Sequence, residues 1–201
     1  MTDFEVVSSR TVYTGKIMSL RVDEVRMPGG RVVVREVIEH GGAVGIVALD
    51  DDGNVVMIRQ YRHPAGTWLL ELPAGLLDVP GEKAVDTARR ELAEEAHLRA
   101  TTWHTLLDIR SSPGLSQEAA RVFLARGLSY VPEADRHVGV DEETDLGVHR
   151  RPLDDAADAV LAGEIENSLA CAGILAAARA RDLDWAPLRP PDAYWAAHPD
   201  H

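Results

Sequence analysis

Residues 75–98 decide how the chain is interpreted. They read G-L-L-D-V-P-G-E from Gly75 to Glu82 and R-E-L-A-E-E-A-H-L from Arg90 to Leu98. Small and apolar residues recur at every fourth position in this region, which predicts a helix over residues 82–97 with one apolar stripe. The residues of the stripe are Ala84, Ala88, Leu92 and Ala96.

Three carboxylates stand together on the predicted helix. Glu91, Glu94 and Glu95 are three or four residues apart, so their side chains reach one face. Like charges at this spacing cost a few tenths of a kcal/mol per pair, and a bound divalent cation would remove that cost. The alternative for the hexapeptide alone is a solvated face held together by Arg89 and Arg90, since helices rich in Glu and Arg are common.

The complete string resembles the Nudix box, whose pattern is Gly, five residues, Glu, seven residues, and then Arg-Glu-apolar-X-Glu-Glu-X-Gly-apolar. The sequence departs from this pattern twice. One extra residue lies between Gly75 and Glu82, and His97 stands where the family has Gly. The first departure lengthens a loop, where insertions cost little, and the second falls at a helix end. Neither alters a carboxylate.

The resemblance implies an α+β fold, the Nudix α/β/α sandwich around a mixed sheet, with the box forming a loop, a helix and a second loop. It implies Mg²⁺, or Mn²⁺ in its place, as the cofactor, and Glu95 counts among the catalytic residues. Arg90 and Glu82 match a structural pair that joins the helix to the loop. The implied metal ligands are Glu91, Glu94, Glu95 and the backbone carbonyl of Ala74.

Four features outside the box resemble the ADP-ribose pyrophosphatase branch of the family. They are Glu71 at the start of Glu-Leu-Pro-Ala-Gly, Pro113 fifteen residues beyond Leu98, Arg62 at the end of Arg-Gln-Tyr-Arg, and the dipeptide Arg35-Glu36. The resemblance implies substrate contacts from Arg35, Glu36, Arg62 and Glu71, the first two across a dimer interface. The alternatives are a Pro-Gly turn at Pro113, a surface arginine at 62, and ordinary polar alternation at residues 35–36.

A general base is expected on the long polar stretch 127–147. By position, Glu142 matches the family's base best and Glu143 second, although such an acidic run more often marks a solvated loop. The reaction implied is hydrolysis of the pyrophosphate bond of ADP-ribose to AMP and ribose 5-phosphate. The alternatives are another nucleotide sugar or dinucleotide, such as GDP-mannose or NADH, and an ADP-ribose sensor without hydrolysis.

Hydrophobic alternation and turn residues predict the remaining elements. We expect an antiparallel β meander over residues 1–40 that forms a homodimer, a catalytic domain over residues 41–181, and a tail over residues 182–201. The expected strands are 5–13, 17–27, 31–39, 43–49, 54–60, 69–72, 103–109 and 119–126, and two further helices are expected at 153–162 and 167–181.

Composition limits the partners. The 33 acidic and 21 basic residues give a formal charge of −12, which disfavours general binding of nucleic acid or anionic membranes. No apolar run approaches the ~20 residues of a membrane span, and the first residues lack the pattern of a signal peptide. A single cysteine, Cys171, is consistent with a reducing compartment. We therefore expect a cytoplasmic enzyme that acts on a small nucleotide sugar.

Overall fold

The computed structural model describes residues 4–137 and 147–198 and divides the strands into three sheets. The first is an antiparallel meander in the order β1-β2-β3, the second has the order β7-β4-β9-β8, and the third has the order β10-β5-β6. The strands are β1 (Glu5–Thr14), β2 (Met18–Arg26), β3 (Val32–His40), β4 (Ala43–Ala48), β5 (Asn54–Arg62), β6 (Thr67–Glu71), β7 (Ala74–Leu76), β8 (Leu98–Arg110), β9 (Ala119–Tyr130) and β10 (Gly147–Pro152). The parallel pairing of β4 with β9, beside antiparallel neighbours, makes the second sheet mixed.

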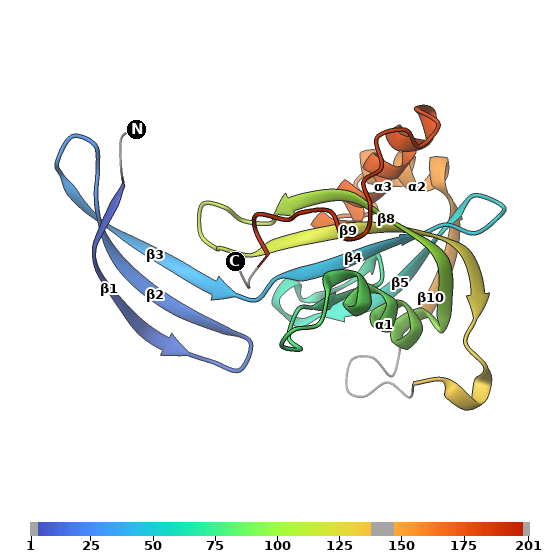
Figure 1. Cartoon of the computed structure of the whole chain (residues 1–201), viewed down its shortest axis with the longest axis horizontal. Helices are drawn as coiled ribbons and strands as arrows, with labels where there is room; N and C mark the ends of the chain where they lie inside the picture. Colours follow the sequence, from blue (N-terminus) through green and yellow to red (C-terminus); the bar gives the residue numbers. More distant parts are fainter. Residues whose placement is uncertain (1–3, 138–146, 199–201) are drawn as a thin grey trace.

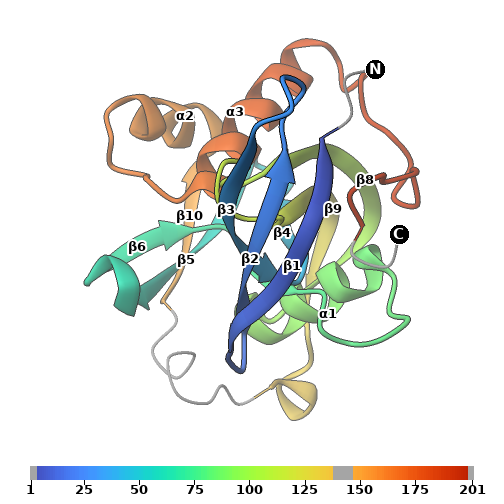
Figure 2. The ribbon, with the colours of Figure 1, turned by 90° about the vertical axis from the view of Figure 1, so that its left-hand side faces the viewer.

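The helices cover the two faces of the mixed sheet. Helix α1 (Ala84–Ala96) lies on one face, while α2 (Leu153–Leu161) and α3 (Ser168–Asp182) lie on the other (Figures 1 and 2). Short 3-10 turns follow β5 at His63–Ala65 and β9 at Glu133–Asp135. The arrangement is the α/β/α sandwich that the family resemblance implies.

Strand alternation explains why one sheet serves two apolar cores. Val44 and Ile46 of β4 pack with Leu92 of α1, whereas Val47, the residue after Ile46, packs with Ile174 of α3. Successive side chains of a strand point to opposite faces, so a strand buried on both sides is apolar throughout. The pattern explains why all six residues of β4 are buried.

The N-terminal meander extends away from this body (Figure 1). Every residue of β1 is exposed. The junction lies at the end of β3, where Ile38 donates to the Leu115 carbonyl at 2.9 Å and accepts from the Gln117 amide at 3.2 Å. Strand β1 is therefore the part of the meander most available for contacts outside the chain.

The structure corrects several predicted boundaries. Strand β8 begins at Leu98 and β9 continues to Tyr130, because the two strands form one long hairpin with Leu98 opposite Tyr130. The predicted loop 127–147 is therefore too long at both ends: β9 fills its first residues, and β10 begins at Gly147, opposite Arg59 of β5. Strand β7 was not expected.

The C-terminal segment, residues 183–198, lies against the body of the fold. The backbone of Arg189 exchanges hydrogen bonds with Thr105 of β8 at 2.9 and 3.2 Å, and Trp195 is only 5% exposed. Sequence alone suggests a tail here, and the described part of that tail is anchored. No helix among the described residues has the length and apolar character needed to cross a membrane.

Candidate active site

Helix α1 presents its carboxylates toward the loop that precedes it. The apolar stripe Ala84, Ala88, Leu92 and Ala96 is buried against the mixed sheet. Glu95 is also buried, and its Oε2 accepts a hydrogen bond from the Ala74 amide at 2.9 Å. This bond fixes β7 to the helix and places the Ala74 main chain beside one of the predicted metal ligands.

Gly75 makes a close approach to Glu91 possible. A Cβ atom at this position would overlap the carboxyl group of Glu91, so a larger residue would displace the carboxylate. The contact explains why Gly75 is needed even though its spacing to Glu82 departs from the box. It brings the loop and the middle of α1 into direct contact.

Arg90 connects the carboxylates of the loop and the helix. Its Nη1 lies 2.6 Å from Glu91 Oε1 and 3.3 Å from Glu94 Oε2, and its Nη2 lies 3.2 Å from Glu82 Oε2. Hydrogen bonding to Arg90 lowers the pKa of Glu82, which also accepts from Thr87 Oγ1 at 2.8 Å. Partial burial would lower the pKa of Arg90, but the hydrogen bond to Glu82 and the surrounding carboxylates outweigh it. The pKa of Arg90 therefore lies above its ordinary value. The predicted pair of Arg90 and Glu82 is thus part of a larger cluster.

The donor chemistry of this cluster suits a hard cation. Glu91, Glu94 and Glu95 supply only carboxylate oxygens, the ligands that Mg²⁺ prefers. The described residues, 4–137 and 147–198, contain no group of three His, Cys, Asp or Glu side chains already arranged around a metal position. Arg90 Nη1 contacts both Glu91 and Glu94, and Glu95 accepts from the Ala74 amide. The three carboxylates and the close approach of the loop at Gly75 are compatible with a bound divalent ion. In this structure the positive charge beside these carboxylates is the Arg90 guanidinium.

Arg62 and Glu71 form a second, separate feature on the α1 side of β5 and β6. Arg62 Nε and Nη2 donate to the two carboxylate oxygens of Glu71 at 2.9 and 2.7 Å, and Glu71 is 1% exposed. Alternation along β5 places Arg62 on the same face as Val56, which packs in the α1 core. Such a two-point pair fixes the guanidinium plane rigidly.

The remaining predicted residues are not brought to this cluster within the described chain. Arg35 and Glu36 are exposed on β3, and Arg35 Nη1 donates a hydrogen bond to the neighbouring Val34 carbonyl at 2.9 Å. Glu142 and Glu143 lie outside the described residues.

Three residues that sequence reasoning missed belong to the site region. Thr87 holds Glu82, and Asp78 Oδ1 lies 3.9 Å from Arg90 Nη2. Gln60 is buried on the face of Arg62, and none of the described residues donates a hydrogen bond to its Oε1. Strand parity with Arg62 would have pointed to Gln60. Nothing in the spacing of the box singles out Thr87 or Asp78.

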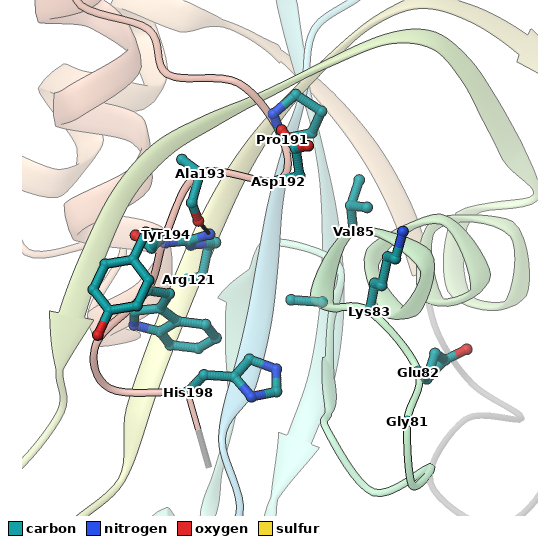
Figure 3. Close-up of a pocket in the computed structure, with 12 residues that line it drawn as sticks. Gly81, Glu82, Lys83, Val85, Arg121, Pro191, Asp192, Ala193, Tyr194 and His198 are labelled. Carbon is teal, nitrogen blue, oxygen red and sulfur yellow. Dashed lines mark hydrogen bonds between the residues drawn. The ribbon is translucent and has the colours of Figure 1, made fainter. Parts of the chain in front are cut away.

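A cavity of about 420 Å³ lies on the other side of the loop, between α1 and the C-terminal segment (Figure 3). Glu82 forms part of its wall but turns away from the C-terminal residues, and its carboxylate binds Arg90 instead. Arg121 at the back of the cavity donates to the main-chain carbonyls of Ala193 and Tyr194 at 2.6 and 3.3 Å. The cavity therefore lies beside the carboxylate cluster rather than within it.

Comparison with known proteins decides the family. A family model described as the NUDIX domain matches residues 39–166, and one described as the nucleoside diphosphate sugar hydrolase N-terminal domain matches residues 4–38. The chain belongs to the Nudix family. This confirms the predicted box, the predicted fold and the predicted class of enzyme, a pyrophosphohydrolase, and it brings the family's general requirement for a divalent metal.

Individual Nudix relatives cover nearly the whole chain. The ADP-ribose pyrophosphatase of Mycobacterium tuberculosis (strain ATCC 25618 / H37Rv) is 52% identical over 197 residues, which span 98% of this chain and 93% of the relative. The ADP-ribose pyrophosphatase of Bacillus subtilis (strain 168) is 34% identical over 161 residues, 80% of this chain and 85% of the relative. A crystal structure of an ADP compounds hydrolase superposes with a TM-score of 0.79 at 21% identity, covering 90% of this chain and 95% of that chain, and so supports the fold.

Proposed function

We propose that the chain hydrolyses the pyrophosphate bond of ADP-ribose to AMP and ribose 5-phosphate. The observation that carries the proposal is the Arg62–Glu71 pair, a guanidinium fixed by a buried carboxylate on the face of the fold that also carries α1. A planar, oriented guanidinium is well suited to bind a pyrophosphate. The two relatives named ADP-ribose pyrophosphatase support this choice of substrate.

In this proposal the metal is Mg²⁺ or Mn²⁺, held by Glu91, Glu94, Glu95 and the Ala74 carbonyl. A divalent ion bound there would polarise the phosphate and lower the pKa of the attacking water. The hydrogen bond from the Ala74 amide to Glu95 supports this assignment, because it orients both the carboxylate and the adjoining peptide.

The chain's own residues bind the substrate and move the proton. Arg62, oriented by Glu71, binds the pyrophosphate. The water oxygen forms a bond to one phosphorus, the bridging P–O bond breaks, and the proton of the water passes to Glu142 or Glu143. Each product then carries one of the two phosphates.

We further propose that the active unit is a homodimer in which Arg35 and Glu36 reach the substrate bound by the partner. The support is the meander, whose apolar side chains are largely exposed, including Phe4 at 62%, Val6 at 55% and Val34 at 59%. Exposed apolar surface of this kind marks an interaction site, and a second copy would cover it. Sedimentation equilibrium at micromolar concentration tests the claim, and a monomeric mass would overturn it.

A substrate panel tests the reaction. We expect catalytic efficiency to be highest for ADP-ribose, with GDP-mannose and NADH lower, and AMP to appear only with a divalent ion present. Arg62→Leu should raise KM for ADP-ribose, whereas Arg59→Leu, a neighbour on the same strand that stacks on Trp68 at 4.8 Å, should leave KM unchanged. Faster cleavage of another dinucleotide would reject the substrate but keep the class, and binding of ADP-ribose without turnover would indicate a sensor.

The proposal places the enzyme in the cytoplasm, acting on a small nucleotide sugar rather than on nucleic acid or membranes. Its support is the formal charge of −12 and the single thiol. Partial burial raises the pKa of the Cys171 thiol, and its sulfur contacts the Ile165 carbonyl at 3.1 Å, which suits a packing role.

A further inference from the structure

The guanidinium of Arg90 serves two groups of carboxylates with different nitrogens. Nη2 and Nε face Glu82 of the loop, at 3.2 and 3.5 Å, while Nη1 faces Glu91 and Glu94 of the helix. Arg90 is therefore shared between a residue outside the proposed metal site and two residues inside it.

A guanidinium and a divalent cation compete for the same oxygens. Glu91 Oε1 lies 2.6 Å from Arg90 Nη1, and a Mg²⁺ ligand distance is about 2.1 Å. An oxygen bound to both would hold two positive charges within a few ångströms of each other, and Glu91 is too buried, at 12% side-chain exposure, for water to screen them well. Binding of the ion thus favours withdrawal of Nη1 from Glu91.

We propose that Arg90 is a built-in counter-cation that competes with the divalent ion for Glu91 and Glu94, and that Glu82 is the carboxylate that retains Arg90 when the ion binds. The inference rests on the proposed metal site. Glu82 is suited to this second role because Thr87 Oγ1 fixes its position at 2.8 Å, and its side chain is 19% exposed. Arg90 then tunes metal affinity as a positioning residue in addition to joining loop and helix.

The two members of the pair should consequently affect metal affinity in opposite directions. Loss of Arg90 removes the competitor and should tighten metal binding. Loss of the charge on Glu82 leaves Arg90 fully on Glu91 and Glu94 and should weaken it. A purely structural pair predicts the same sign for both changes, since either would loosen the loop.

Titration of the full chain with Mn²⁺, followed by the electron paramagnetic resonance signal of free Mn²⁺, measures the Kd without substrate. We expect Arg90→Gln to lower the Kd about tenfold and Glu82→Gln to raise it about tenfold, which corresponds to about 1.4 kcal/mol in each direction. Thermal unfolding of each variant shows whether it is folded. If Arg90→Gln does not fold, Arg90→Met takes its place, because it keeps most of the aliphatic stem while removing the charge, and an unchanged or higher Kd in the folded variant would overturn the proposal.

Matched controls separate contact from overall charge. Arg89→Gln removes the same charge one residue away, where Arg89 pairs with Asp86 at 2.6 Å on the exposed side of α1. Asp86→Asn is the corresponding control for Glu82. Both should change the Kd by less than about twofold, because exposed charges are screened. Equal changes in the Kd for Mn²⁺ from Arg89→Gln and Arg90→Gln would show that only the net charge of the protein matters, and would reject the inference.

Glu91→Gln distinguishes this inference from the proposed function. If the unaltered chain binds Mn²⁺ and Glu91→Gln abolishes binding while Arg90→Gln weakens it, the metal site stands and the competition is rejected. If Glu91→Gln has no effect on Mn²⁺ binding, the metal site itself is wrong and both proposals fall.

Discussion

Two arginines, Arg121 and Arg90, each bring distant segments together, but they do so in opposite surroundings. Arg121 is 3% exposed and bonded to one carboxylate, Asp108, and two main-chain carbonyls, with its guanidinium 4.9 Å from the centre of the Trp195 ring. Arg90 is 31% exposed and lies within 4 Å of four carboxylates.

The difference separates a structural site from a functional one. The buried charge of Arg121 is balanced by Asp108, and its other acceptors are main-chain carbonyls of the C-terminal segment. Arg121 therefore holds that segment to the body of the fold. Around Arg90, negative charge exceeds positive charge, which costs stability unless a further cation joins. Changes near Arg121 should therefore affect folding, and changes near Arg90 should affect turnover.

Glu95→Gln should show the largest effect and tests the functional half of this comparison. The amide can still accept the hydrogen bond from Ala74, so the fold should be retained, but one charged oxygen ligand is lost. We expect turnover of ADP-ribose to fall by about 10³-fold or more, equivalent to about 4 kcal/mol in activation free energy. Steady-state assays of AMP release measure this, and unchanged activity would remove Glu95 from the metal site.

Arg121→Met tests the structural half. It removes a buried cation and leaves Asp108 paired with the more exposed Arg189, at 2.9 Å, so the free energy of unfolding should fall by about 3 kcal/mol. Urea unfolding measures the change. Arg189→Met is the matched control, because Arg189 binds the same carboxylate but is 39% exposed, and should cost about 1 kcal/mol or less. Equal costs would show that burial of Arg121 does not matter.

The pH dependence of stability sharpens the same comparison. Burial would raise the pKa of Asp108, but hydrogen bonds from Arg121 and Arg189 outweigh it and hold the pKa below its ordinary value. Because the pKa of Asp108 is lower in the folded state than in the unfolded state, its contribution to the free energy of unfolding is complete above pH about 4. That contribution is lost as the pH falls through the folded-state pKa. Between pH 6 and 3, the free energy of unfolding measured in urea should fall less for Asp108→Asn than for the unaltered chain. An identical slope would contradict the role of Asp108.

Sequence predicts the functional region better than the structural one. The carboxylates of α1 are recognisable because helical periodicity and the box spacing fix their relative positions. Arg121 could not be singled out, because its partners Asp108 and Ala193 are distant in the chain and no spacing rule joins them. The C-terminal segment looked like a tail because its prolines exclude regular structure, although its backbone can still pair with β8.

Long-range pairing also explains the missed strands. Strand β10 is short and polar, and only its register with β5 makes it a strand. Strand β7 has three residues, too few for a pattern, and is held by β4 and by Glu95. The sequence shows only that Gly75 occupies a box position, whereas the structure shows that its lack of a side chain makes room for the Glu91 carboxyl.

His97 gives the smallest expected effect and tests whether the end of α1 is strained. It caps the helix with φ 54° and ψ 37°, a left-handed conformation that glycine adopts without cost, and its Nδ1 is buried without a hydrogen-bond partner among the described residues. His97→Gly should therefore raise the free energy of unfolding by about 0.5 to 1 kcal/mol, the gain being limited by the entropy of glycine in the unfolded chain.

His97→Ala is the control, because alanine loses the same side chain but keeps the left-handed cost, and should be less stable than His97→Gly. A destabilised glycine variant would mean that contacts of the imidazole outweigh the backbone strain. Stabilisation with unchanged Mn²⁺ affinity would show that His97 does not influence the Arg90 cluster, although it caps the helix that carries Arg90.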